Sequence, residues 1–204
     1  MNNPIKEEYS FIGYLAWLLQ QEDRSAARAA MAHLRNGLRK PAGAAYEMDR
    51  YVLVHLPGNA NQRQEDAYYL VASLFASWHQ GEEKVKTLAG ERSTDRNLGK
   101  SLDILAREYV KDGVSLDEAR KRLELRFNAL LEADSENLAE YLRQNVSLLR
   151  SKAVPINWAQ LLHDTQAWNT DSRFVQHEWA KGFWVNREST DDNPKTSSHG
   201  TEEK

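Results

Sequence analysis

Cysteine is absent from the 204-residue sequence. Its absence excludes disulfide bonds, thiol nucleophiles and cysteine metal sites, and it is typical of a reducing compartment, which favours a cytoplasmic location. Long apolar runs are absent too, since none approaches the roughly 18 residues that a membrane-spanning helix needs, and the mean hydropathy is -0.72. The first residues, MNNPIKEEYS, lack a basic segment followed by an apolar one. We therefore expect neither a secretory signal nor a membrane partner.

Motifs of common enzyme chemistry are also missing. The sequence contains no G-x-G-x-x-G, Walker, G-x-S-x-G or H-E-x-x-H motif. One enzymatic alternative is a metal-dependent phosphohydrolase built around the adjacent pair His163 and Asp164. The spacing of this pair to the other histidines matches no metal-ligand pattern, so ordinary surface or core histidines are the preferred interpretation.

Clustered carboxylates offer a second enzymatic alternative, a pair of acids drawn from Glu132, Asp134, Glu136 and Glu140. The spacing instead favours Asp134 or Ser135 as a helix N-cap, with Glu136 in the first turn of the helix that comes next. We therefore predict no enzyme activity, no cofactor and no metal site.

Charge of one sign is in only slight excess. The net charge is -3, and residues 188–204 account for all of it with five acidic and two basic side chains. Within the rest of the chain, residues 24–126 hold 18 Lys and Arg against 14 Asp and Glu. A pI near 6.1 is far from the strongly basic balance of an autonomous DNA-binding protein. If nucleic acid is a partner, we expect other proteins to hold most of it.

Apolar residues recur at helical spacing along the chain, and no segment alternates with the period of a strand. We therefore predict an all-α protein with no sheet. The polar, charge-alternating residues 80–95 predict a long loop, and the acidic tail 188–204 predicts disorder. The helices are expected near residues 11–21, 25–40, 44–56 and 61–80, three within 97–158, then 157–168 and 171–186.

Four tryptophans lie in the last two predicted helices: Trp158, Trp168, Trp179 and Trp184. Exposed aromatic rings can stack on nucleic-acid bases. The spacing of these residues is more typical of the apolar face of an amphipathic helix, so we predict that they belong to the core.

Basic side chains form the one pattern that points to a ligand. On a helical wheel, one predicted helix places its leucines on one side and four basic residues on the other: Arg96, Lys100, Arg107 and Lys111. Another helix carries four arginines along the flank of its apolar stripe: Arg24, Arg28, Arg35 and Arg39. The remaining candidates are Arg63 at the start of the fourth helix, the pair Arg122 and Arg126 one turn apart, and the pair Arg143 and Arg150 two turns apart.

Cationic side chains spread over several helices suit phosphates rather than base edges, because no groove-docking motif is present. Two interpretations stay open from the pattern alone. One is sequence-independent binding of a nucleic-acid backbone. The other is a helical protein–protein adaptor whose basic faces are merely solvated.

Several segments, taken in order, resemble the CasB family, the small subunit of the type I-E CRISPR interference complex, Cascade. The segments are SAARAAMAHLRNGL, AYYLVASLFASW, LGKSLDILA, RFNALLEAD, LAEYLRQNVSLLRSKAVPINWAQLLHD and VQHEWAKGFW, and the resemblance covers roughly residues 10–186. It implies two small packed helical bundles, which we place at residues 1–92 and 93–187. It also implies a non-catalytic subunit that stabilises the R-loop in antiviral defence. The implied partners are the backbone and large subunits, a second copy of the chain, target DNA and guide RNA.

The resemblance singles out five of the basic positions as contacts to nucleic acid: Arg35, Arg63, Lys100, Arg126 and Arg143. Lys100 stands where many relatives have arginine, and Asn36 stands where a second basic residue can follow Arg35. A lysine keeps the charge but loses the bidentate fork of a guanidinium. The basic pattern alone adds five further candidates: Arg28, Arg39, Arg96, Arg107 and Arg150.

Overall fold

The computed structural model describes residues 5–39, 45–83 and 97–185, and within these ranges every regular element is helical. The elements, in chain order, are α1 (Lys6–Leu19), α2 (Arg24–Asn36), the 3-10 turn η1 (Gly37–Arg39), α3 (Tyr46–Val52), the 3-10 turn η2 (Leu53–His55), α4 (Gln62–Trp78), α5 (Leu98–Lys111), α6 (Leu116–Glu132), α7 (Ser135–Ser151), α8 (Trp158–Gln166) and α9 (Phe174–Trp184). The all-α prediction is confirmed for the described part of the chain. None of these helices is both long and apolar enough to cross a membrane.

Polar caps begin most of the long helices, because a side-chain oxygen satisfies backbone N–H groups that have no partner within the helix. Asp23 accepts from Ser25 and Ala26 at the start of α2, and Asp134 accepts from Asn137 at the start of α7. The predicted cap at Asp134 or Ser135 is therefore confirmed, and Asp134 is the residue that caps. Helix α1 begins at Lys6, earlier than the predicted residue 11, because its first turn is mostly polar and hides the apolar spacing.

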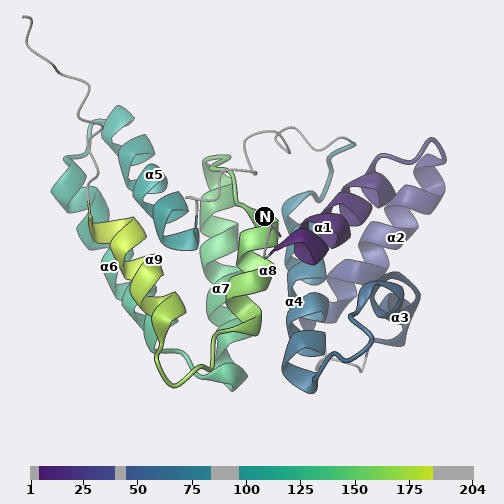
Figure 1. The fold of residues 1–204 in the computed structure, drawn as a ribbon. Helices are drawn as coiled ribbons and strands as arrows, with labels where there is room; N and C mark the ends of the chain where they lie inside the picture. Colours follow the sequence, from purple (N-terminus) through teal and green to yellow (C-terminus); the bar gives the residue numbers. More distant parts are fainter. Residues whose placement is uncertain (1–4, 40–44, 84–96, 186–204) are drawn as a thin grey trace, which may run out of the picture.

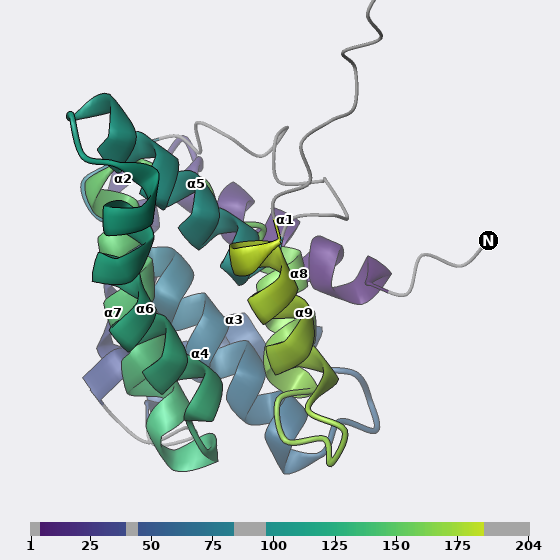
Figure 2. The same cartoon turned by 90° about the vertical axis from the view of Figure 1, so that its left-hand side faces the viewer.

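The helices form two sides joined by a central pair (Figure 1). Helices α1 to α4 lie on one side, α5, α6 and α9 lie on the other, and α7 and α8 lie between them. Seen from the side in Figure 2, α9 crosses in front of α8 next to α5. Helix α8 packs against α4 and α1, α7 packs against α4 and α6, and one continuous hydrophobic core runs through both sides. The division at residues 92/93 into two bundles stays a prediction.

Three of the four late tryptophans are buried, which confirms their prediction as core residues. Trp158, Trp168 and Trp179 are among the largest fully buried side chains. The prediction was wrong for Trp184, which is 40% exposed. The preceding residue, Phe183, occupies the core position at the end of α9, and side chains of consecutive helical residues point in directions about 100° apart.

Helices α5 and α9 approach each other closely through a glycine on each. A side chain at Gly99 would run into the backbone carbonyl of Trp179, and one at Gly182 would run into the Asn97 side chain. The Asn97 amide completes the contact by donating to the Glu178 carbonyl at 2.9 Å. There is no space for a Cβ atom at either position, so helix packing requires glycine at both.

We therefore expect G99A to lower the free energy of unfolding by about 1–3 kcal/mol, because a methyl group cannot enter this contact without moving a helix backbone. The matched control is G13A on the exposed face of α1, where an added Cβ meets nothing within 4 Å. Alanine should stabilise the chain there by about 0.5–1 kcal/mol. Urea unfolding of both variants measures the difference, and equal effects would contradict the packing argument.

Candidate nucleic-acid interface

One face of α7 lines two neighbouring hollows between the two sides of the molecule. The residues on this face recur every three or four positions: Glu136, Ala139, Glu140, Arg143, Val146, Ser147 and Arg150. The first hollow, with a volume of about 540 Å³, is closed on the opposite wall by Arg35, Leu38, Leu74, Ser77 and Gln80. We call it the arginine hollow, because Arg35, Arg143 and Arg150 all line it. Helical periodicity and the α4–α7 packing together bring these three guanidiniums to one place.

The Arg35 guanidinium has no partner among the described residues. Arg35 lies half-buried in the last turn of α2, and within residues 5–39, 45–83 and 97–185 its side chain makes no hydrogen bond or ion pair. Burial lowers the pKa of its guanidinium, and the positive charge of Arg150 lowers it further. Arg35 and Arg150 therefore repel each other. A bound anion would reduce this repulsion and stabilise both charged side chains.

Arg150 has a structural partner as well as a place in the hollow. Its Nη1 donates to the Ser77 carbonyl at 3.1 Å and its Nη2 donates to the Gln80 carbonyl at 2.7 Å. These carbonyls belong to the last turn of α4 and the residue beyond its cap. A cation at this end of a helix satisfies free carbonyls and complements the helix dipole. Arg150 therefore holds α7 to α4 while it contributes charge to the hollow.

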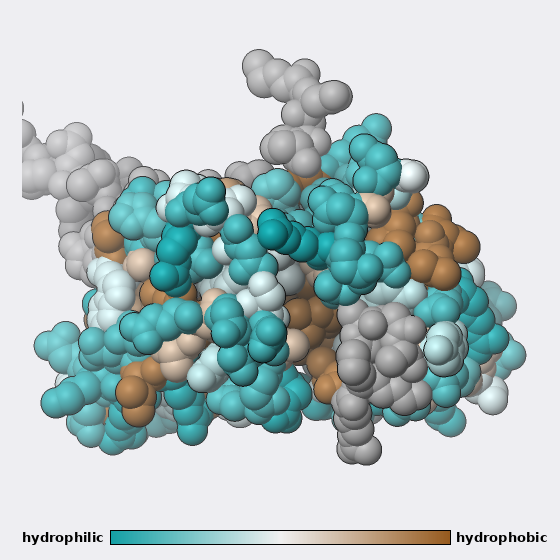
Figure 3. All heavy atoms as spheres, turned by 90° about the horizontal axis from the view of Figure 1, so that it is seen from below, coloured by the Kyte–Doolittle hydropathy of each residue, from teal (hydrophilic) through white to brown (hydrophobic). Residues whose placement is uncertain are grey.

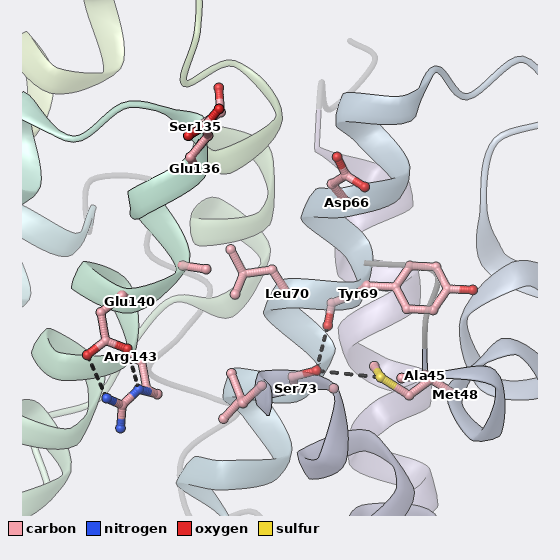
Figure 4. A pocket seen from close by; sticks show the side chains of 13 residues that line it. Ala45, Met48, Asp66, Tyr69, Leu70, Ser73, Ser135, Glu136, Glu140 and Arg143 are labelled. Carbon is pink, nitrogen blue, oxygen red and sulfur yellow. Dashed lines mark hydrogen bonds and ion pairs between the residues drawn. The ribbon is translucent and has the colours of Figure 1, made fainter. Parts of the chain in front are cut away.

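Arg143 is paired within its own helix. Its Nε donates to Glu140 Oε2 at 2.9 Å and its Nη2 donates to Glu140 Oε1 at 2.6 Å, as Figure 4 shows. Both side chains are about half exposed. The bond to Arg143 lowers the pKa of Glu140, and the same bond raises the pKa of Arg143. Glu140 is the one carboxylate among the described residues that line the arginine hollow.

The second hollow has both apolar and charged side chains in its lining and lies next to the first. Its wall is formed by α3, α4, α7 and the segment around η1, and Leu38, Met48 and Leu70 are among its apolar side chains. Figure 4 shows this hollow from close by. The view from below in Figure 3 shows apolar surface gathered in a depression between the two sides, surrounded by a mostly hydrophilic surface. Leu38, Glu140 and Arg143 line both hollows, so the two are continuous.

The basic face of α5 is tied to a buried carboxylate rather than left to solvent. Asp103 accepts from Lys100 at 3.2 Å, from Arg107 at 3.1 Å and from Arg120 of α6 at 2.6 Å. Burial raises the pKa of Asp103, but the bonds from Arg120, Arg107 and Lys100 outweigh it and lower the pKa. Three cations from α5 and α6 therefore share one buried anion. Lys100 and Arg107 are therefore held in place, and part of their charge is compensated.

The remaining candidates are scattered. Arg28 lies within 3.8 Å of Glu83 at the edge of a third hollow that Arg35 also lines. Arg63 is exposed on α4 and Arg126 is exposed on α6, away from the arginine hollow. Arg96 and the side chain of Arg39 lie outside the described residues, as do most of the predicted loop 80–95 and the tail 188–204. The structure thus brings together three of the ten predicted residues, Arg35, Arg143 and Arg150.

The pair His163 and Asp164 serves packing between helices. His163 Nδ1 lies 3.4 Å from Glu8 of α1, and buried Asp164 accepts from Trp179 Nε1 at 2.6 Å and from Gln160 at 2.8 Å. Among the described residues, no group of three His, Asp or Glu side chains is placed to hold a metal ion. These contacts join α8 to α1 and α9.

Two side chains that pair with the candidate residues were not predicted from the sequence to do so. Glu140 was considered only as a candidate catalytic acid, although its spacing of three residues from Arg143 is the spacing of a helical ion pair. Arg120 is absent from the predicted set, and its partner Asp103 lies 17 residues away. The first contact could be found from the sequence, whereas the second depends on how α5 and α6 pack.

Comparison with known proteins points to one family. The family model for CRISPR-associated protein Cse2 matches residues 30–184. A CRISPR-associated protein Cse2 from Thermus thermophilus is 31% identical over 172 residues, which cover 84% of this chain and 88% of that protein. A crystal structure of CasB from Thermus thermophilus is similar with a TM-score of 0.66 at 30% identity, over 88% of this chain and 98% of that one. A chain of a CRISPR RNA-guided surveillance complex in a pre-nicking state shares the fold, with a TM-score of 0.66 at 24% identity over 88% and 92% of the two chains.

The buried position of Asp164 predicts a pH dependence of stability. Burial raises its pKa to about 6, against about 3.9 for an unfolded aspartate. The folded chain therefore binds this proton more tightly, and its stability should fall as the pH rises from about 4 to about 6, by at most 2–3 kcal/mol.

The variant D164N should remove this fall, because the amide stays neutral. Its amide nitrogen cannot accept a hydrogen bond, so only one of the donors Trp179 Nε1 and Gln160 Nε2 keeps its acceptor, and the variant should be less stable than the parent near pH 4. Urea unfolding at a series of pH values measures the effect. D171N, at an exposed position, is the matched control and should follow the parent. Parallel curves for D164N and the parent would contradict the prediction.

Proposed function

The chain belongs to the CRISPR-associated Cse2 family, which includes the CasB proteins, and from this premise we propose that it is the non-catalytic small subunit of an RNA-guided surveillance complex of the Cascade type. In that complex it holds the nucleic-acid backbone through the arginine hollow and so stabilises the R-loop in antiviral defence. Its partners are the backbone and large subunits, a second copy of the chain, the target DNA and the guide RNA.

The meeting of Arg35 and Arg150 is the observation that carries this proposal. Helices α2 and α7 bring both guanidiniums to the lining of the arginine hollow, and the charge of Arg150 lowers the pKa of Arg35. The Arg35 side chain has no ion-pair partner among the described residues. Guanidinium groups bind phosphate oxygens with two parallel hydrogen bonds. A phosphate at this position would relieve the repulsion between the two cations.

Binding of this kind reads charge and shape, not sequence. Phosphate contacts fix the register of a protein on nucleic acid and carry no base information. In RNA-guided complexes, base pairing with the guide supplies the sequence recognition. The chain is near neutral and has a local cluster of arginines. This suits a subunit that adds a few phosphate contacts to those made by the other proteins of a larger assembly.

The exposed basic residues outside the hollow extend this surface as weaker contacts. Arg63, Arg126 and the Asp103-bound Lys100 and Arg107 are each placed on a rigid helix. Exposed charges of this kind contribute on the order of 1 kcal/mol or less and are screened by salt.

The adaptor alternative draws support from apolar side chains on the N-terminal side. Trp17 is 59% exposed and Val54 is 71% exposed. Large exposed apolar residues favour contact with another protein. Nucleic-acid binding and an adaptor role are compatible. They differ in whether the arginine hollow binds phosphate or is only solvated.

We expect R35A and R143A to weaken target-DNA binding by the assembled complex about fivefold each, because each removes a phosphate contact worth on the order of 1 kcal/mol. The slope of log affinity against log salt should become shallower by about one per contact. R50A is the matched control, since Arg50 is an exposed arginine on α3, outside the hollow, whose Nη2 lies 3.0 Å from His33 Nδ1. Titration of guide-matched duplex DNA at several salt concentrations measures both quantities.

Two results would count against the proposal. Unchanged affinity and slope in R35A and R143A would show that the hollow does not contact nucleic acid. Failure of these variants to enter the complex, with normal DNA affinity in whatever assembles, would favour the adaptor. Arg150 is left out of the test because its loss would also remove the α4–α7 contact.

A further inference from the structure

The arginine hollow contains its own anion. Glu140 lines it together with Arg35, Arg143 and Arg150, and no second carboxylate appears among the described lining residues. One of the three arginines, Arg143, is therefore neutralised before any ligand arrives, while Arg35 is not. An incoming phosphate thus meets one arginine that is already paired and another that is not.

The Glu140 carboxylate occupies the edge of Arg143 that would bind a phosphate. The Nε and Nη2 donors both point to the two oxygens of Glu140, at 2.9 Å and 2.6 Å. This is the parallel, bidentate geometry that guanidinium also uses for phosphate. The same two N–H groups cannot serve both acceptors, so a phosphate on this edge has to displace Glu140.

The Glu140 carboxylate keeps one hydrogen bond when it is displaced from Arg143. Glu140 Oε1 also accepts from Gln144 at 2.8 Å, one turn further along α7. Glu140 and Arg143 are both about half exposed, and exposed ion pairs of this kind are weak. The exchange of Glu140 for a phosphate is therefore a small barrier that a ligand with several phosphates can cross.

We propose that Glu140 is an internal competitor of the nucleic-acid phosphate, and that it sets the affinity threshold of the arginine hollow. This inference rests on the proposed function. A single small anion gains little by replacing Glu140 on Arg143. A nucleic-acid backbone that also reaches Arg35 and Arg150 gains enough contacts to drive the exchange, so the hollow favours a continuous backbone over isolated anions.

The test is E140Q in the assembled complex, with guide-matched duplex DNA as the probe. Glutamine keeps the size of the side chain and removes its charge. We expect target binding to tighten about twofold to fivefold at low salt, because Arg143 no longer has a charged partner and an exposed ion pair is worth about 1 kcal/mol or less. The slope of log affinity against log salt should become steeper, because one more uncompensated cation takes part in counterion release.

Two further variants make the interpretation specific. In an R143A background, E140Q should tighten binding less than it does in the parent, because the donors for which glutamate and phosphate compete are gone and only the repulsion between Glu140 and the phosphate is removed. E118Q is the matched control, since Glu118 forms an equally exposed pair with Arg122 on α6. It changes the net charge by the same amount, and we expect its affinity and slope to equal those of the parent.

The outcomes separate this inference from the function on which it rests. If R143A weakens binding while E140Q leaves affinity and salt slope unchanged, Glu140 is not a competitor and the proposed function still stands. If E140Q and E118Q tighten binding equally, the effect is one of net charge and the inference is overturned. If R35A and R143A leave binding unchanged, the proposed function fails first.

Discussion

The contact between α4 and α7 is the constraint on which the rest of the structure depends. Arg150 closes it by donating to two carbonyls at the C-terminal end of α4. Helix α4 packs against α2, α8 and α7, so it connects the N-terminal helices to the centre of the molecule. Both hollows of the candidate interface lie along this contact, and their shape depends on how α4 and α7 are held.

Charge compensation decides which basic residues are available to a ligand. Lys100, Arg107 and Arg120 surround the buried Asp103, and they stabilise a carboxylate whose pKa burial alone would raise. Arg143 is balanced by Glu140, and Arg28 lies near Glu83. Arg35 has no such partner among the described residues and faces another cation. Counting positive charges along a helix therefore overstates the surface that can bind phosphate.

Much of the fold could be predicted from the sequence because local rules govern it. Helical spacing of apolar residues identified the helices, and Asp134 was recognisable as a cap because a cap bonds to backbone only two or three residues away. The start of α1 at Lys6 and the exposure of Trp184 were missed. In both cases the local pattern is ambiguous, and the position of neighbouring helices decides whether a side chain is buried.

The sequence by itself determined the helices, the family resemblance and the set of basic residues from which an interface can be drawn. Only the tertiary structure decided which of those residues act together. Arg35 and Arg150 are 115 positions apart in the chain and meet because α2 and α7 both line the arginine hollow. Asp103 collects its cations from two helices for the same reason. Electrostatic interactions depend on distance in space and on burial. The sequence pattern gives neither of these for residues on different helices.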